Sequence, residues 1–292
     1  MKNKPFYLLS IISASLLTQS GANASPLVSI GDNADIFFNG SSSLRWQSNV
    51  FRDEDTETDD ILWTFSPGFE LNVGRGLANA DFSVSTRYDI LRYQDADKLD
   101  TELFHINAKG SYRASRLDLN ASVSFDESQS TSGDNLVDAD LIEYDTFGVR
   151  VDGEYRFSPK FSFGAGVLYS EREYDSKFQD RFADRESVSV PLDVFYEMTP
   201  KVDLSFGYVY STTDIEGTFN SDSLIAIGDY ETDSHFFNIG ARGNLMPKLT
   251  GFFKIGYRTL DSDSASVTFD PDGVNTSLVT TNGDDSGMLG LD

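Results

Sequence analysis

The sequence predicts an all-β protein, an antiparallel up-and-down transmembrane β-barrel, and three observations support this fold class. Apolar residues occupy every second position in successive rows from about residue 35 onward, which is the pattern of half-buried strands. Each row covers about nine to eleven residues, the length that a tilted strand needs to cross a bilayer. Short turns alternate strictly with long polar loops, as they do in outer-membrane barrels.

The N-terminal segment differs from the rest in composition. Two lysines precede a mostly apolar stretch, Phe6–Leu17, which is too short to span a bilayer as a helix. Residues 22–24 read Ala-Asn-Ala, the pattern of a signal-peptide cleavage site. We expect residues 1–24 to be a signal peptide, with an uncleaved anchor as the alternative, and residues 25–292 to form the barrel.

Eleven strands are expected, and each shows the same two-residue alternation. In the second of them, for example, Trp63, Phe65 and Phe69 share one face while Ser66 and Glu70 share the other. The first strand is the least regular, because three consecutive serines interrupt its pattern. The expected strands are residues 36–50, 63–73, 80–90, 104–112, 117–125, 147–157, 161–169, 188–196, 202–210, 237–245 and 249–259.

The connections set the expected topology. Short turns face the periplasm in barrels of this class, so the long loops should lie outside the cell. The long loops are expected at residues 51–60, 93–102, 126–145, 171–186, 212–233 and 260–286.

The final segment, residues 287–292, resembles the opening of a twelfth strand. Bacterial barrels have an even strand count, and an open edge in lipid leaves backbone groups unpaired. Outer-membrane barrels also usually end on an aromatic residue that the barrel assembly machinery reads, whereas this sequence ends on Asp292. We therefore expect a barrel truncated at the C-terminus, whose complete form has about 12 to 16 strands.

Two other β architectures share part of this pattern. A propeller blade has a similar repeat length but does not predict strict alternation of short and long connections. A soluble β-sandwich also has alternating strands, but its apolar face must fill a packed core, and core rows rarely end in tyrosine strand after strand. Tyrosines at the row ends favour a barrel, because their amphipathic rings suit the lipid headgroup level. These are Tyr88, Tyr112, Tyr155, Tyr169, Tyr196, Tyr210 and Tyr257.

The overall charge excludes one class of partner. The chain has 47 acidic and 23 basic residues and a formal net charge of -24. Nucleic-acid binding requires a basic surface, so it is not expected. The chain contains no cysteine, so no disulfide framework supports the fold.

The polar rows carry charges of both signs at mid-strand and are expected to line the lumen. The candidate lumen-lining residues are Arg45, Arg87, Lys109, Arg113, Arg150, Asp152, Glu154, Arg156, Asp193, Arg242, Lys254 and Arg258. A dense acidic run should form an acidic mouth, composed of Asp53, Glu54, Asp55, Glu57, Asp59 and Asp60. Such a mouth would concentrate cations and disfavour anions. The alternative is that the lumen charges pair to brace the wall and the loop charges are simply solvated.

Metal binding and catalysis are not expected, and neither is a cofactor. Asp261, Asp263, Asp270 and Asp272 could gather oxygen ligands for Ca²⁺ or Mg²⁺ and so bridge to lipopolysaccharide, although Asp-Pro-Asp-Gly is more simply a turn. Enzymatic outer-membrane barrels need histidine with serine or carboxylate partners. The only histidines are His105, in a polar row, and His235, expected near the outer rim.

Four segments carry a family resemblance: SPKFSFGAGVLYSERE, TPKVDLSFGYVYS, MPKLTGFFKIGYRTLDSD and SGMLGLD. They resemble the hairpin repeat of the putative beta-barrel porins of the second type, over most of the mature chain. The resemblance implies an outer-membrane barrel, often encoded near exopolysaccharide or capsule genes, and it supplies no catalytic residue.

The expected function is therefore a porin-like outer-membrane channel, with a possible link to exopolysaccharide export. A closed structural or adhesive barrel, whose acidic loops bind a partner or surface polysaccharide, is the alternative. Outer-membrane lipid, lipopolysaccharide and the barrel assembly machinery are the expected partners, with polysaccharide as a further candidate.

Overall fold

The computed structural model describes most of the chain after residue 24. The described residues are 25–51, 57–74, 79–131, 141–179, 181–220, 225–246, 249–269, 276–282 and 286–291. Within them, no helix is long and apolar enough to cross a membrane.

The described residues form one antiparallel sheet with a single short 3-10 helix, η1 (Asp97–Leu99). The strands are β1 (Val28–Ile30), β2 (Ala34–Gln47), β3 (Asp60–Val73), β4 (Ala80–Tyr93), β5 (Thr101–Arg113), β6 (Leu117–Thr131), β7 (Leu141–Arg156), β8 (Phe161–Tyr174), β9 (Arg185–Thr199), β10 (Val202–Ile215), β11 (Thr218–Asn220), β12 (Ile225–Met246), β13 (Leu249–Phe269), β14 (Thr276–Asn282) and β15 (Ser286–Leu291).

The up-and-down order predicted from the sequence is confirmed. Each long strand pairs with the next one along the chain, from β2 to β10 and on through β12 to β13. These are the eleven predicted strands. The segment expected to open a twelfth strand lies in β15, which pairs with β13. β14, which pairs with another part of β13, lies in residues 260–286, which were predicted to be a loop. The strand order runs from β1 to β14, and among the described residues no pairing joins its two ends.

The strands are longer than their apolar rows, which corrects four of the predicted loops. The β6–β7 ladder continues to the pair Thr131 and Leu141, and the β12–β13 ladder reaches the pair Ile225 and Thr268. β8 and β10 likewise extend into segments that were predicted to be loops. Backbone N–H and C=O groups can pair between strands whether the side chains are apolar or polar. The ladder therefore persists beyond the point where the hydrophobic alternation fades.

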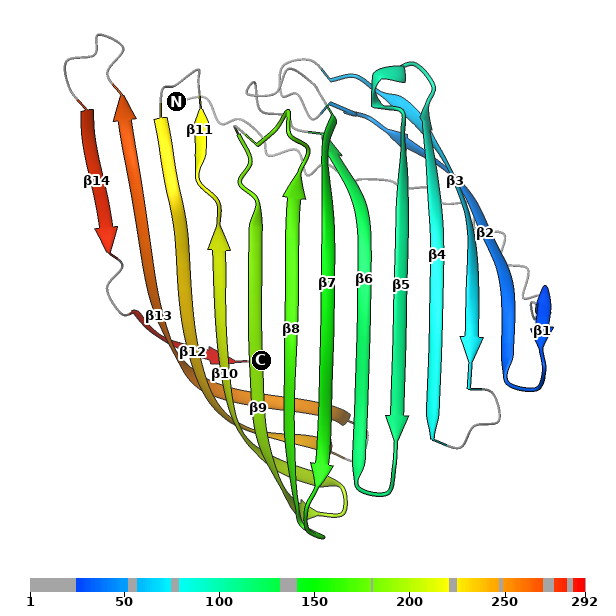
Figure 1. Cartoon of the computed structure of the whole chain (residues 1–292), viewed down its shortest axis with the longest axis vertical. Coiled ribbons are helices and arrows are strands. Elements are labelled where there is room, and N and C mark those ends of the chain that lie inside the picture. Colours follow the sequence, from blue (N-terminus) through cyan, green and yellow to red (C-terminus); the bar gives the residue numbers. More distant parts are fainter. Residues whose placement is uncertain are drawn as a thin grey trace, which may run out of the picture.

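The sheet is a single layer whose apolar face is exposed. On that face the side chain of Phe206 is 61% exposed, and Leu44 and Ile239 are exposed to a similar extent. The buried apolar clusters are small, and one of them joins Val50, Leu99 and Leu141 beside the longer connections. A β-sandwich would cover the apolar rows with a second sheet. Figure 1 shows instead one curved sheet.

The sheet bends sharply at the short-turn end of its last strands. In Figure 1 the lower parts of β10, β12 and β13 sweep sideways, whereas β4 to β6 run nearly straight. Register shifts fall between Val202 and Asp203 and between Asn244 and Met246. Between them lies Gly243, with φ +117°. Bulges increase local bending and twist, and glycine adopts positive φ without the steric cost of a Cβ.

We predict that Gly243→Ala destabilises the sheet. The new Cβ would overlap the carbonyl oxygen of Lys201, and the backbone conformation is unfavourable for alanine. The expected loss is about 1–3 kcal/mol of unfolding free energy, measured by urea titration of tryptophan fluorescence in lipid. Gly251→Ala is the control, because a Cβ there meets no atom within 4 Å. Equal unfolding midpoints for the two variants would contradict this account.

Candidate functional site: the polar face of the sheet

The register of the strands gathers the predicted lumen residues on one side of the sheet, here called the polar face. One row across neighbouring strands pairs Asp118 with Glu154, Glu154 with Gly164, and Gly164 with Asp193. Because successive side chains of a strand point to opposite faces, every second residue from these positions also lies on the polar face. All twelve candidates lie on this face: Arg45, Arg87, Lys109, Arg113, Arg150, Asp152, Glu154, Arg156, Asp193, Arg242, Lys254 and Arg258.

Arg242 is held by groups from three other strands. Its Nη1 and Nη2 each donate a 2.8 Å hydrogen bond to the carboxylate of Glu154 on β7, and its Nε donates to Asp203 Oδ2 on β10 at 3.0 Å. Its guanidinium carbon lies 3.5 Å from the ring centroid of Phe195 on β9. Ser162 Oγ also donates to Glu154, at 2.5 Å. Bidentate arginine–carboxylate pairs with a stacked aromatic ring are strong and geometrically specific. We call this arrangement the Arg242 clamp.

The Arg242 clamp requires a curled sheet. In strand order, β8, β9 and β10 lie between β7 and β12. Strands are about 4.8 Å apart, so four spacings would separate β7 from β12 by roughly 19 Å in a flat sheet. Glutamate and arginine side chains cannot span that gap with a 2.8 Å contact. The bend at Gly243 therefore brings the polar faces of β12 and β7 toward one another.

A second ion pair crosses the same region. Lys254 Nζ on β13 donates to Asp193 Oδ1 on β9 at 3.1 Å, with β10 and β12 between these strands. Gly207 lies beneath this pair, and a Cβ there would collide with the carboxylate of Asp193 and the amide of Asn238. Asn238 is 2% exposed, and its side-chain oxygen and nitrogen have no hydrogen-bond partner among the described residues. The polar face is thus closely packed over β8 to β13.

The polar face of β3 to β7 is more open. Arg87 pairs with Asp89 at 2.9 Å and Arg150 with Asp152 at 2.7 Å, each within its own strand. The two arginine side chains remain 54% and 57% exposed. Charges paired at this exposure contribute little stability and stay accessible to water.

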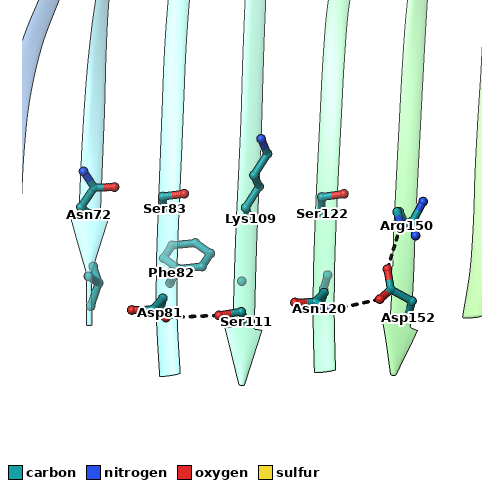
Figure 2. Close-up of a pocket in the computed structure, with 13 residues that line it drawn as sticks. Asn72, Asp81, Phe82, Ser83, Lys109, Ser111, Asn120, Ser122, Arg150 and Asp152 are labelled. Carbon is teal, nitrogen blue, oxygen red and sulfur yellow. Dashed lines mark hydrogen bonds and ion pairs between the residues drawn. The ribbon is translucent and has the colours of Figure 1, made fainter. Parts of the chain in front are cut away.

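A cavity of about 600 Å³ lies on this open part, near the short-turn end of the strands. Figure 2 shows hydroxyl, amide and charged groups from neighbouring strands around it. Asn120 donates to Asp152 at 3.1 Å and Ser111 to Asp81 at 3.2 Å, both drawn as dashed lines in Figure 2. Lys109 also lines the cavity, and within the described part of the chain it makes no ion pair. The wall therefore offers donors and acceptors together with one unpaired cation.

The two histidines lie on opposite faces. His105 lies on the polar face, with Nε2 3.1 Å from Asp89 and Nδ1 2.9 Å from Asp126. His235 was expected to precede a strand but lies within β12, on the apolar face, with Nδ1 2.8 Å from the hydroxyl of Tyr208. Asp233 instead accepts a hydrogen bond from Tyr210. Ser234 points to the other face, so these neighbours do not form a catalytic triad.

The predicted acidic mouth is only partly described, and one of its members has a structural role. Asp53, Glu54 and Asp55 lie outside the described residues, while Glu57 and Asp59 are both exposed. Asp60 is 4% exposed and accepts backbone N–H groups of Ile61, Gln94, Asp95 and Ala96.

The pKa of Asp60 follows from this environment. The residue precedes the apolar row of β3. Burial by itself would raise the pKa of Asp60, but the backbone N–H donors of Ala96, Ile61, Asp95 and Gln94 together hold it below its usual value. The charge of Asp60 therefore anchors the segment before η1 and is not presented to solutes.

An acidic pocket on the long-connection side was not predicted. Glu102, Glu127, Glu143, Asp145, Glu173 and Asp175 line a cavity of about 300 Å³. Several of these positions had been assigned to loops. Asp145 lies two residues before Phe147 in β7, and Glu173 lies four residues after Tyr169 in β8. Continuing the alternation of each strand would therefore have placed both acidic residues on the same face.

The structure describes two of the four aspartates that could gather metal ligands. Asp261 and Asp263 lie within β13, whereas Asp270 and Asp272 lie outside the described residues. Among the residues that the structure describes, no group of three or more acidic or histidine side chains could hold a metal ion.

These features define the class of the chain as an up-and-down antiparallel sheet with one exposed apolar face and one charged polar face. A family model described as putative beta-barrel porin 2 matches residues 39–269. The chain belongs to this family, which the sequence resemblance had indicated. No curated protein matches it.

We predict that Asp60→Asn lowers the unfolding free energy by about 1–3 kcal/mol near neutral pH, because several backbone donors lose a charged acceptor. A carboxyl whose pKa is depressed by folding stabilises above its unfolded pKa and loses that contribution as the pH falls through the folded value. The difference from the unaltered protein should therefore vanish in acid. Urea titrations over a pH series check this.

Glu57→Gln is the control for that series, since Glu57 is exposed in the same acidic run. A deficit in Asp60→Asn that persists unchanged at low pH would show that its charge is not the stabilising feature.

Proposed function

We propose that the protein is a porin-like channel of the bacterial outer membrane. The observation that carries the proposal is the consistent division of the long strands into an exposed apolar face and a charged polar face, in a chain that belongs to a porin family. An apolar face of this kind can contact lipid only if every backbone group is paired within the sheet. The polar face would then line a water-filled lumen.

In this proposal the twelve charged candidates are lumen-lining residues with two roles. Arg242, Lys254 and their carboxylates brace the wall, because their charges are paired across strands. Arg87, Lys109 and Arg150 face the path, because they lie on the open part of the polar face. An acidic mouth would consist of the exposed members of the acidic run without Asp60, whose carboxylate is occupied by backbone donors.

The cellular setting belongs to the same proposal. Residues 1–24 would direct export as a signal peptide, and the barrel assembly machinery would insert the mature chain among outer-membrane lipid and lipopolysaccharide. A role in exopolysaccharide export is the finer form of the proposal, and it rests on the family resemblance.

A closed structural or adhesive barrel is the second candidate. The Arg242 clamp favours it, because side chains that join β7 to β12 occupy space that a solute would need. The two candidates differ in one measurable property, the passage of solutes.

Liposome swelling separates these candidates. The full-length protein would be refolded into liposomes and challenged with neutral sugars of rising size and with anionic oligosaccharides. Size-dependent swelling would support the channel, and passage of the anionic series would support a polysaccharide route. Absence of swelling, with folding shown by heat-modifiable electrophoretic mobility, would support the closed barrel.

We predict that Lys109→Gln makes the channel more cation-selective, because it removes a cation that has no carboxylate partner among the described residues. Reversal potentials in a salt gradient should shift in the direction of cation selectivity. Lys160→Gln is the control, because Lys160 lies in the short turn between β7 and β8 and does not line the cavity beside Lys109. An unchanged reversal potential in Lys109→Gln would place the ion path elsewhere.

A further inference from the structure

We propose that the Arg242 clamp and the Lys254–Asp193 pair form a constriction that sets the largest solute able to pass. This inference rests on the proposed channel function. The two ion pairs hold the polar face of β8 to β13 folded toward β7, so that the open path lies along β3 to β7.

Burial differs between the two parts of the polar face, although Ser66 on β3 and Ile142 on β7 are buried too. Ser162, Phe195, Ser205 and Asn238 lie on the polar face of β8, β9, β10 and β12, and all four are buried. Residues that line a water-filled path should be exposed, as Arg87 and Arg150 are on β4 and β7. The polar face of β8 to β12 is therefore closed by its own side chains.

Small residues make this close packing feasible. A Cβ on Gly207 would collide with Asp193, and a Cβ on Gly240 would overlap the carbonyl oxygen of Phe253 and press on Lys254. Gly164 leaves room for the ring of Phe195, against which Arg242 stacks. Glycine weakens a strand, so its recurrence at these positions fits a close approach of other groups.

The electrostatics of the constriction are balanced. Arg242 faces Glu154 and Asp203, and Lys254 faces Asp193, so each cation has a carboxylate within 3.1 Å. Removing one member leaves its partner charged and partly desolvated, which is costly and favours exposure of that partner to water. Loss of Arg242 should therefore open the constriction rather than merely remove one contact.

The first test measures single-channel conductance and the sugar-size cutoff of Arg242→Ser and Glu154→Gln in lipid. Both variants should raise the cutoff and increase conductance by about twofold or more, because conductance grows with the open cross-section. Arg92→Gln is the matched control, because it breaks an arginine–glutamate pair between two neighbouring strands on the opposite, apolar face of the sheet. Its cutoff should stay unchanged.

A cross-linking test keeps the inference falsifiable if the clamp variants fold poorly. The chain contains no cysteine, so Glu154→Cys/Arg242→Cys introduces the only thiols. A short, reducible bifunctional thiol reagent should join them and restore the narrow cutoff, and reduction should widen it again. Heat-modifiable mobility verifies folding in each state.

The outcomes are distinct. Folded, conducting clamp variants with an unchanged cutoff would overturn the constriction and leave the channel function intact. Conductance that appears only after the clamp is broken would support the constriction as a closed barrier. Absence of conductance in every folded variant, including the reduced cysteine pair, would overturn the channel function and the constriction with it.

Discussion

Lateral hydrogen bonding between successive strands is the constraint on which the rest of this structure depends. The sheet is one layer, and most of its large apolar side chains are exposed instead of packed into a core. Each long strand must therefore satisfy its backbone polar groups through its neighbours. This requirement explains why the chain is a series of antiparallel hairpins, and why the ladders continue where the regular hydrophobic alternation has ended.

The sequence contained most of the fold because alternation determines the face of every residue. The two-residue alternation and the short turns predict the eleven strands and their order. They also predict that the charged candidates share one face. The strand ends did not follow. Residues such as Asp145 and Glu173 carry no hydrophobic alternation, and only the phase they share with Phe147 and Tyr169 reveals their position. Asp60 was assigned to the acidic mouth because it stands in an acidic run. Most of the backbone groups that bind it lie 34 to 36 residues away, so no nearby sequence feature indicates its structural role.

The charge pairs of the polar face were only partly predictable for a related reason. The polar rows contain nearly equal numbers of basic and acidic residues, so ion pairs that brace the wall could be expected. Pairs such as Arg150 and Asp152 are also close in sequence. Glu154 and Arg242 are 88 residues apart and are separated by three strands in the sheet. Their contact depends on curvature from one positive-φ glycine and two register shifts. The polar-face glycines and Phe195, an aromatic residue in a polar row, were the available sequence indications.

The last long strands, β12 and β13, extend far beyond their apolar rows on the side of the long connections. β12 and β13 contain 22 and 21 residues, about 70 Å of extended chain each, whereas an apolar bilayer core is about 30 Å thick. Much of each strand thus projects beyond its apolar row as hydrogen-bonded sheet. A macromolecule that meets this projection contacts a stiff, pre-ordered backbone. Its association would incur little of the entropy loss that accompanies the ordering of free loops.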